Sequence, residues 1–308
     1  MLDLNQTDLN LLETIAGISD VPTGAFNIRA NGTSAGRASS EHVEITPKID
    51  KPGIDIRIKP GTFGETVYIP VVVTESGLQD TVYNDFYIGE AADVVIIAGC
   101  GIHNEGCSES RHDGIHTFHV GKNAKLKYVE KHYGESTGEG TNVMNPTTIV
   151  EMEKNSYVEM ETVQIKGVDS TDRITKATLE EGATLIVGEK IMTHGVQHAG
   201  TDFTVDLNGK GSSANIVSRS VAKDRSTQVF VSNIRGNNLC HGHSECDAIV
   251  MDDAVVSAIP QIVANSVDAS LIHEAAIGKI AGEQLEKLMT LGLSEKEAEE
   301  QIINGFLK

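Results

Sequence analysis

The chain has 308 residues and a net charge of −19 at neutral pH, from 44 acidic and 25 basic residues. An acidic surface repels phosphate, so nucleic acid and anionic membrane are not expected partners. No apolar run approaches the roughly 20 residues that span a bilayer, and the N-terminus lacks the basic start and apolar stretch of a signal peptide. Four cysteines are too few for a disulfide framework, which indicates a reducing cytoplasm with free or metal-bound thiols.

The first elements suggest a short helix over residues 7–17. Leu9, Leu12 and Ile15 recur on one face, and Thr7 offers a cap for the first turn. We therefore expect an N-terminal helical segment at residues 1–24. From about residue 25 the helical period disappears, and short Val/Ile/Thr-rich runs alternate with turns rich in Gly, Asn, Asp and Lys.

The middle of the chain contains a repeated layout: a charged or glycine turn, a small residue, then alternating strand residues. The small residues are Ala124, Ser156, Ala183, Ser213 and Ser226, at successive spacings of 32, 27, 30 and 13. This indicates a coil of roughly 28–30 residues with a half-coil near 14, as in a β-solenoid, where stacked coils cover one another's apolar faces. A sandwich or barrel with similar hairpin spacing is the alternative. We assign the β core to residues 25–277.

After residue 278 a helical pattern returns, and we assign residues 278–308 to a helical hairpin. Gly292 lies in the expected turn, and Ser294 with Glu297 three residues later forms a capping box for the second helix. The hairpin can pack on the end of the solenoid and still offer a docking face to a partner.

Four potential metal ligands occur within seven positions of the segment NNLCHGHSECD: Cys240, His241, His243 and Cys246. Strand alternation sends both cysteines to one face and both histidines to the other, so one strand cannot easily close a tetrahedral zinc site. Two interpretations remain: the four residues are ordinary strand residues that bind no metal, or they belong to an open site completed by residues elsewhere.

A second cluster lies in residues 100–119, and no zinc-finger spacing fits it. It is either a metal site or a set of ordinary polar groups, and His194 and His198 are a weaker candidate pair. The members of the cluster are Cys100, His103, Cys107, His112, His116 and His119.

Several enzyme signatures are absent from the sequence. There is no G-x-x-x-x-G-K-[ST] phosphate loop and no G-x-S-x-G nucleophile elbow. Acidic side chains are plentiful, so a β-helix enzyme acting on acidic carbohydrate is one alternative. A structural metal-binding or assembly protein is another.

The end of the chain carries an ordered series of short motifs. They are Cys246–Asp247, Pro260, Asp268–Ala269, His273–Glu274–Ala275, Gly278–Lys279, Glu283–Gln284–Leu285, Gly292–Leu293 and Gly305–Phe306. This order over residues 241–306 resembles the core domain of the SufB/SufD family of iron–sulfur cluster assembly proteins.

The resemblance implies a right-handed parallel β-helix flanked by helices, and a scaffold rather than an enzyme. It implies pairing through the last coils, either as a heterodimer of paralogues or as a homodimer. It also implies that the C-terminal helices bind a SufC-type ABC ATPase. Clusters formed on such a scaffold pass to downstream apo iron–sulfur proteins or carriers.

The resemblance further implies that Cys246 and His273 are ligands of iron and of a transient iron–sulfur cluster, with Glu274 as a nearby ligand or proton acceptor. Cys240, His241 and His243 become neighbours of this site. SufB often has an acidic residue where this chain has Ile272, and tends to have a cysteine near residues 218–224, where this chain has none. We therefore expect a stand-alone homodimer, whose two Cys–His pairs form one shared site that opens when the subunits move.

Overall fold

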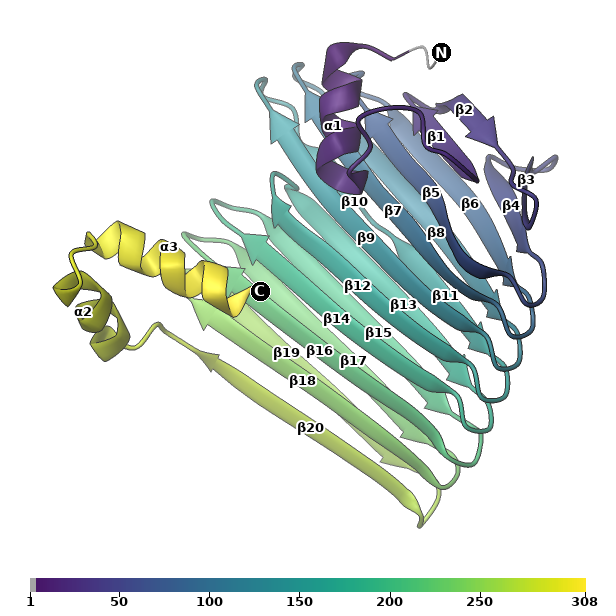
Figure 1. Ribbon diagram of the computed structural model, residues 1–308. Coiled ribbons are helices and arrows are strands. Elements are labelled where there is room, and N and C mark those ends of the chain that lie inside the picture. Colours follow the sequence, from purple (N-terminus) through teal and green to yellow (C-terminus); the bar gives the residue numbers. More distant parts are fainter. Residues whose placement is uncertain (1–3) are drawn as a thin grey trace.

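The computed structural model describes residues 4–308, which form a two-layered β-solenoid with helices at both ends (Figure 1). The chain passes alternately through two sheets, so each central strand pairs with strands of the preceding and following coils. Sheet A contains β1 (Phe26–Ala30), β2 (Thr33–Ala38), β5 (Phe63–Val73), β7 (Asp93–Asn104), β9 (Lys125–Ser136), β12 (Tyr157–Lys166), β14 (Thr184–Thr193), β16 (Ser212–Ala222), β18 (Cys240–Val250) and β20 (Ala269–Gly278). Sheet B contains β3 (Val43–Pro47), β4 (Gly53–Ile58), β6 (Gln79–Ile88), β8 (Ser110–Val120), β10 (Asn142–Met144), β11 (Thr147–Met152), β13 (Ser170–Leu179), β15 (His198–Leu207), β17 (Thr227–Gly236) and β19 (Val255–Ala264). The expected mainly β solenoid is confirmed.

The coil length follows the predicted period. Lys125 pairs with Tyr157, and Tyr157 pairs with Thr184, at offsets of 32 and 27 residues. One predicted small residue is displaced by one position: Ser212, not Ser213, is the buried residue after its turn. The backbone N–H of Ser212 donates to the carbonyl of Gly209, closing the same kind of turn as elsewhere in the repeat.

The N-terminal helix α1 (Gln6–Ala16) begins one residue earlier than predicted, and its cap is Asn5 rather than Thr7. The side chain of Asn5 accepts a hydrogen bond from the backbone N–H of Asp8, and the Asp8 carboxylate accepts one from the Asn5 N–H. The helix packs on the outer face of sheet A, where a Cβ at Gly101 would lie 3.2 Å from the Leu11 side chain. Glycine therefore permits the close approach. Residues 1–3 of the expected helical segment lie outside the described residues.

The N-terminal end of the solenoid is closed by antiparallel pairs. Strand β2 folds back along β1 at the edge of sheet A, and β3 folds back along β4 at the edge of sheet B. Antiparallel return strands and the adjacent helix shield the first coils from further pairing. Among residues 4–308, no such return strand covers the opposite end, at β19 and β20.

The space between the sheets is apolar over most of its length. Aromatic rings stack from coil to coil, as between Phe86 and Phe118, whose ring centroids are 4.3 Å apart. A buried ion pair between Arg173 and Glu130 interrupts this core, and His132 lies beside it. Burial acts to raise the pKa of Glu130, but the positive charge of Arg173 outweighs it and holds that pKa well below its usual range.

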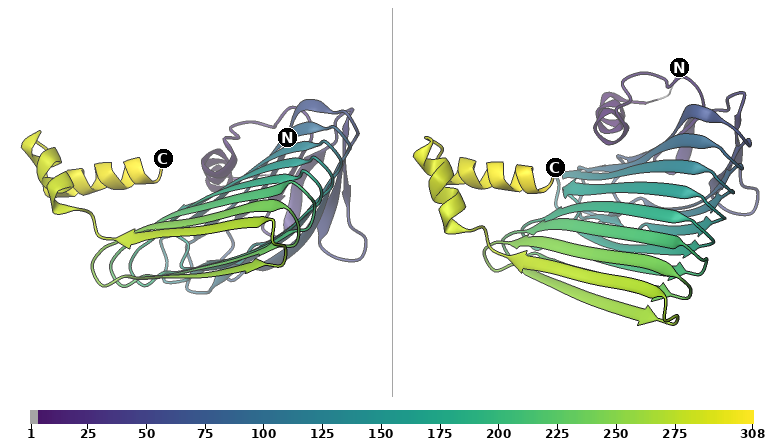
Figure 2. Two further views of the ribbon diagram at one scale, coloured as in Figure 1. Left: turned by 90° about the horizontal axis from the view of Figure 1, so that it is seen from below. Right: turned by 60° about the horizontal axis from the view of Figure 1, so that its bottom comes forward.

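The C-terminal hairpin consists of α2 (Gly282–Thr290) and α3 (Glu295–Phe306), and its capping box of Ser294 and Glu297 is confirmed. The end of the hairpin packs Ile303 and Leu307 against Val221 of β16. Helix α2 buries no residue and stands away from the sheets (Figure 2). Within residues 4–308, no helix has both the length and the apolar character needed to cross a membrane.

Candidate functional site

The C-terminal end of the solenoid is open. Strands β19 and β20 are the last members of their sheets, and each pairs on one side only. Ile262 and Ile277 face inward, in register with the buried Ile234 and Ala248, yet they remain 43% and 42% exposed because no further coil covers them. This end therefore presents two strand edges and uncovered core residues on one surface.

Strand β18 carries the predicted NNLCHGHSECD ligands with the predicted alternation. Cys240 and Cys246 are buried, whereas His241 and His243 point outward. The two cysteines lie six residues apart along an extended strand, a separation of about 20 Å. A closed zinc site made from these four residues is therefore excluded by the geometry.

Cys246 lies on the inner face of β18, the last strand but one of sheet A, where it is 1% exposed. It pairs in register with Ser218 of β16 and Ala275 of β20. Burial raises the pKa of the Cys246 thiol to about 12, and the charges of Glu189 and Asp247 add to this effect. The thiol therefore stays protonated until a metal cation displaces the proton or a base removes it.

A polar column runs inward from Cys246 along sheet A. Ser218, one coil back, donates a hydrogen bond of 2.7 Å to the carboxylate of Glu189, which lies one further coil back in the same register. The column continues through Thr162 to Glu130 of the central ion pair. Glu189 and Ser218 were not predicted as site residues, although their spacings of 29 and 28 residues to the next member match the coil period.

His273 also faces inward, directly opposite Ser244 of β18. Its side chain is therefore on the same face as Cys246 and two positions away in register. Within residues 4–308, the buried Nδ1 atom of His273 and the hydroxyl of Ser244 have no hydrogen-bond partner. Burial lowers the pKa of His273, and the neighbouring His243 lowers it further, so the imidazole is held neutral with a nitrogen available to a ligand.

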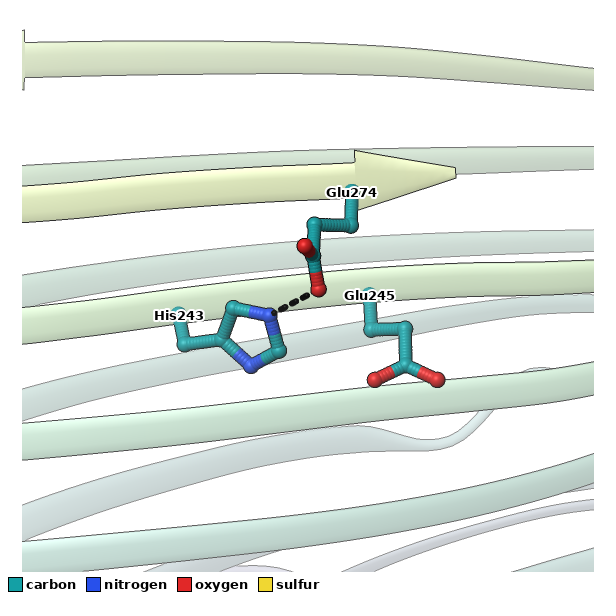
Figure 3. A group of neighbouring side chains, drawn as sticks. All are labelled: His243, Glu245 and Glu274. Carbon is teal, nitrogen blue, oxygen red and sulfur yellow. Dashed lines mark hydrogen bonds and ion pairs between the residues drawn. The ribbon is translucent and has the colours of Figure 1, made fainter. Parts of the chain in front are cut away.

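Glu274 lies on the opposite face from Cys246 and His273, because successive residues of a strand alternate. The strand geometry therefore does not bring Cys246, His273 and Glu274 together around one centre. Glu274 instead meets His243 and Glu245 of β18 on the outer face (Figure 3). Sequence reasoning missed Glu245, although its place two residues after His243 puts it on the same face.

The donor atoms of this outer group converge. His243 Nε2 lies 3.1 Å from Glu274 Oε2, and potential ligand atoms of all three side chains lie within 4.8 Å of one another. His243 Nδ1 lies 2.8 Å from the side-chain oxygen of Asn215 on β16. An imidazole and two carboxylates in this arrangement can hold a divalent metal ion.

The residues of the 100–119 cluster are distributed over several environments and do not gather. His112 and His116 are buried and bonded to Asp80 and Tyr128, and His119 is bonded to Glu151 on the outer face of sheet B. Cys100 is buried on β7, His103 contacts two glutamates, and Cys107 is exposed in the turn before β8. Of the weaker pair, His198 contacts Asp172 and Thr227, while His194 lies in the preceding turn.

A large cavity lies elsewhere, on the outer corner of sheet B. It has a volume of about 740 Å³ and is lined in part by Arg57, Tyr87 and His119, which stack in one register column. Its acidic lining residues, Glu44, Glu151, Glu153 and Glu180, outnumber its basic residues Arg57 and Lys59. That charge balance does not suit an acidic carbohydrate.

Comparison with known proteins identifies the family. The family described as "SUF system FeS cluster assembly, SufBD core domain" matches residues 78–306. The chain belongs to the SufBD family. An iron–sulfur cluster assembly SufBD family protein of Archaeoglobus fulgidus is 30% identical over 269 residues, covering 87% of this chain and 71% of the relative.

Two further SufBD family proteins have similar relationships to the chain. The one from Methanothermobacter thermautotrophicus (strain Delta H) is 29% identical over 83% of this chain and 62% of its own length. The one from Methanocaldococcus jannaschii is 28% identical over 82% of this chain and 79% of its own length. The chain thus spans about 60–80% of these relatives, and its place in the SufBD family supports a role in iron–sulfur cluster assembly.

Proposed function

We propose that this SufBD protein is a scaffold on which an iron–sulfur cluster forms at the open end of the solenoid. The observation that carries the proposal is the inward pair of Cys246 on β18 and His273 on β20, the uncapped last strand of sheet A. A thiolate suits iron, and a neutral imidazole supplies a more labile second ligand. The cluster is cargo in this scheme, and the protein performs no catalytic reaction of its own.

The same end supports a homodimer. One chain brings one cysteine, Cys246, close to one inward histidine, His273, so a cluster with four protein ligands needs a second copy. Apolar residues on the outer faces of β19 and β20, including Ile259, Val263 and Ile272, are exposed in the single chain. Burying them against a copy of the same end would remove apolar surface from water and satisfy the free edges of β19 and β20.

A SufC-type ABC ATPase is the proposed partner of the C-terminal hairpin. The chain has no phosphate loop of its own, so movement driven by ATP must come from another protein. Leu285, Leu288 and Met289 give α2 an apolar stripe, and the helix buries no residue in this chain. The hairpin contacts β16 through Val221. A force applied to the hairpin would therefore be transmitted to β16, close to the last coils of the solenoid.

Anaerobic reconstitution with iron and sulfide tests this function. Wild type should develop cluster absorption and retain iron and sulfide, whereas Cys246→Ser and His273→Ala should lose most of both while unfolding at nearly the wild-type temperature. Cys107→Ser is the matched control, because Cys107 is exposed and far from the open end. Loss of the cluster in Cys107→Ser but not in the other two variants would refute the assignment.

A structural metal protein is the second candidate, and the convergence of His243, Glu245 and Glu274 favours it. Tightly bound zinc that survives removal of iron and sulfide, and that sets the unfolding temperature, would support that candidate over the scaffold.

A further inference from the structure

The outer face of the last two strands brings like charges together. Glu245 and Glu274 are direct neighbours across β18 and β20. Two carboxylates in this position repel each other, which destabilises the pairing of the strands. Asp247 adds a third carboxylate two residues along the same face, and Arg219, its partner in register on β16, is the basic side chain opposite it.

Glu245, Asp247 and Glu274 together place three carboxylates on this face, against one guanidinium, that of Arg219, and one imidazole, that of His243. A bound cation would relieve the repulsion among these carboxylates.

The orientation of His243 points to the same conclusion. The side-chain oxygen of Asn215 is an acceptor, so the Nδ1 atom of His243, 2.8 Å away, carries the proton and donates it. Nε2 is then the nitrogen that meets the Glu274 carboxylate at 3.1 Å, and either a proton on Nε2 or a metal ion bound by both groups satisfies this contact. Metal-binding histidines are commonly oriented by a hydrogen bond to their second nitrogen in this way.

The distances suit a small divalent ion. Two metal–ligand bonds of about 2.1 Å at right angles place their donor atoms about 3.0 Å apart, close to the observed separation of His243 Nε2 and Glu274 Oε2. One nitrogen and two carboxylate oxygens leave coordination positions for water, which is typical of exchangeable Fe²⁺ or Mn²⁺ rather than of a closed zinc site.

We propose that His243, Glu245 and Glu274 bind one Fe²⁺ ion on the outer face of the last coil. The choice of iron rests on the proposed function. Glu245 precedes Cys246 and Glu274 follows His273, so the two sites lie back to back on the same two strands. The outer site would hold ferrous iron, without change of oxidation state, beside the inner ligands that receive it.

Metal titration of the full-length protein without sulfide tests this site, because no cluster can form under that condition. Wild type should bind one Fe²⁺ per chain anaerobically, and should bind Co²⁺ with visible absorption typical of nitrogen and oxygen ligands. His243→Ala and Glu245→Gln should each weaken binding at least about tenfold, and Asn215→Ala should weaken it less. Glu159→Gln removes an outward carboxylate from β12 of the same sheet and should leave binding unchanged. All these side chains are on the outer face, and thermal unfolding checks that each variant is folded.

Cys246→Ser separates this inference from the proposed function. It should keep the Fe²⁺ bound without sulfide while losing the cluster formed with sulfide. Loss of the Fe²⁺ in Cys246→Ser but not in His243→Ala, or no binding by wild type, would overturn the outer site. If wild type assembles no cluster but binds Fe²⁺ in a manner dependent on His243, the scaffold proposal fails and the outer site stands.

Discussion

The protonation of Cys246 leads to a quantitative prediction. Burial, with Glu189 and Asp247, raises the pKa of this thiol from 9.0 to about 12. Because each unit changes the thiolate population tenfold, the reactive thiolate at pH 8 falls by about a thousandfold relative to an ordinary thiol. Iodoacetamide should therefore alkylate Cys246 at least about a thousandfold more slowly in the folded, metal-free protein than in the urea-unfolded chain.

Pulsed alkylation followed by mass spectrometry of peptides measures this ratio for each cysteine in one sample. Cys107 is exposed and should react rapidly in the folded protein, which makes it an internal reference. Cys100 is fully buried, and burial raises its pKa well above the usual range, so it should be protected as Cys246 is.

An alkylation rate of Cys246 within tenfold of its rate in urea would refute the reasoning, since it would require an exposed or ionised thiol in the native state.

The protonated state of Cys246 also affects metal binding. Iron must displace the thiol proton, so reconstitution at Cys246 should be faster at pH 8.5 than at pH 7, while metal binding by an already ionised thiolate would show no such dependence.

Three further predictions concern stability and assembly. Arg173→Met leaves Glu130 buried without its cation and should cost about 3–5 kcal/mol, or roughly 5–8 °C in Tm for a chain of 308 residues. Calorimetry should show a smaller loss of stability at pH 5 than at pH 7.5. Without Arg173, burial raises the pKa of Glu130, so this carboxylate takes up a proton as the pH falls. Equal losses at both pH values would contradict the ion-pair account. Ile272→Asp places a charge on the exposed apolar end and should shift light scattering from dimer to monomer, and an unchanged dimer would move the interface elsewhere. Truncation after Gly282 should abolish co-purification with an ABC ATPase while the β-sheet circular dichroism persists, and retained binding would exclude the hairpin as the docking site.

The coil period was predictable because each turn needs a small buried residue, and that requirement recurs along the sequence. The error at Ser213 shows the limit of this reasoning. Both Ser212 and Ser213 are small, and only the hydrogen bond to Gly209 decides which one closes the turn. The cap of α1 was missed for a related reason, since Asn5 and Thr7 are both good capping residues and the choice depends on where Asp8 falls in the first turn.

The candidate site was predictable in part. Strand alternation correctly separated Cys246 from His243. The spacing of 27 residues from Cys246 to His273 is close to one coil, and the two residues do lie on neighbouring strands. Applied to adjacent residues, the same alternation also separates His273 from Glu274, which the family motif presents as a unit. His112 and His119 could not be assigned from sequence, because their partners, Asp80 and Glu151, lie one coil away.

The one-sided pairing of β20 has a consequence for local unfolding. In a stacked solenoid each coil is stabilised by its immediate neighbours, so stability is distributed along one dimension. A central strand must break two ladders to open, whereas β20 must break only its ladder with β18. Its amide hydrogens should therefore exchange with solvent faster than those of β14 or β16 in the monomer, and this difference should shrink when the end is covered. A cluster held there could then leave by fraying of a single strand, while the remaining coils keep their fold.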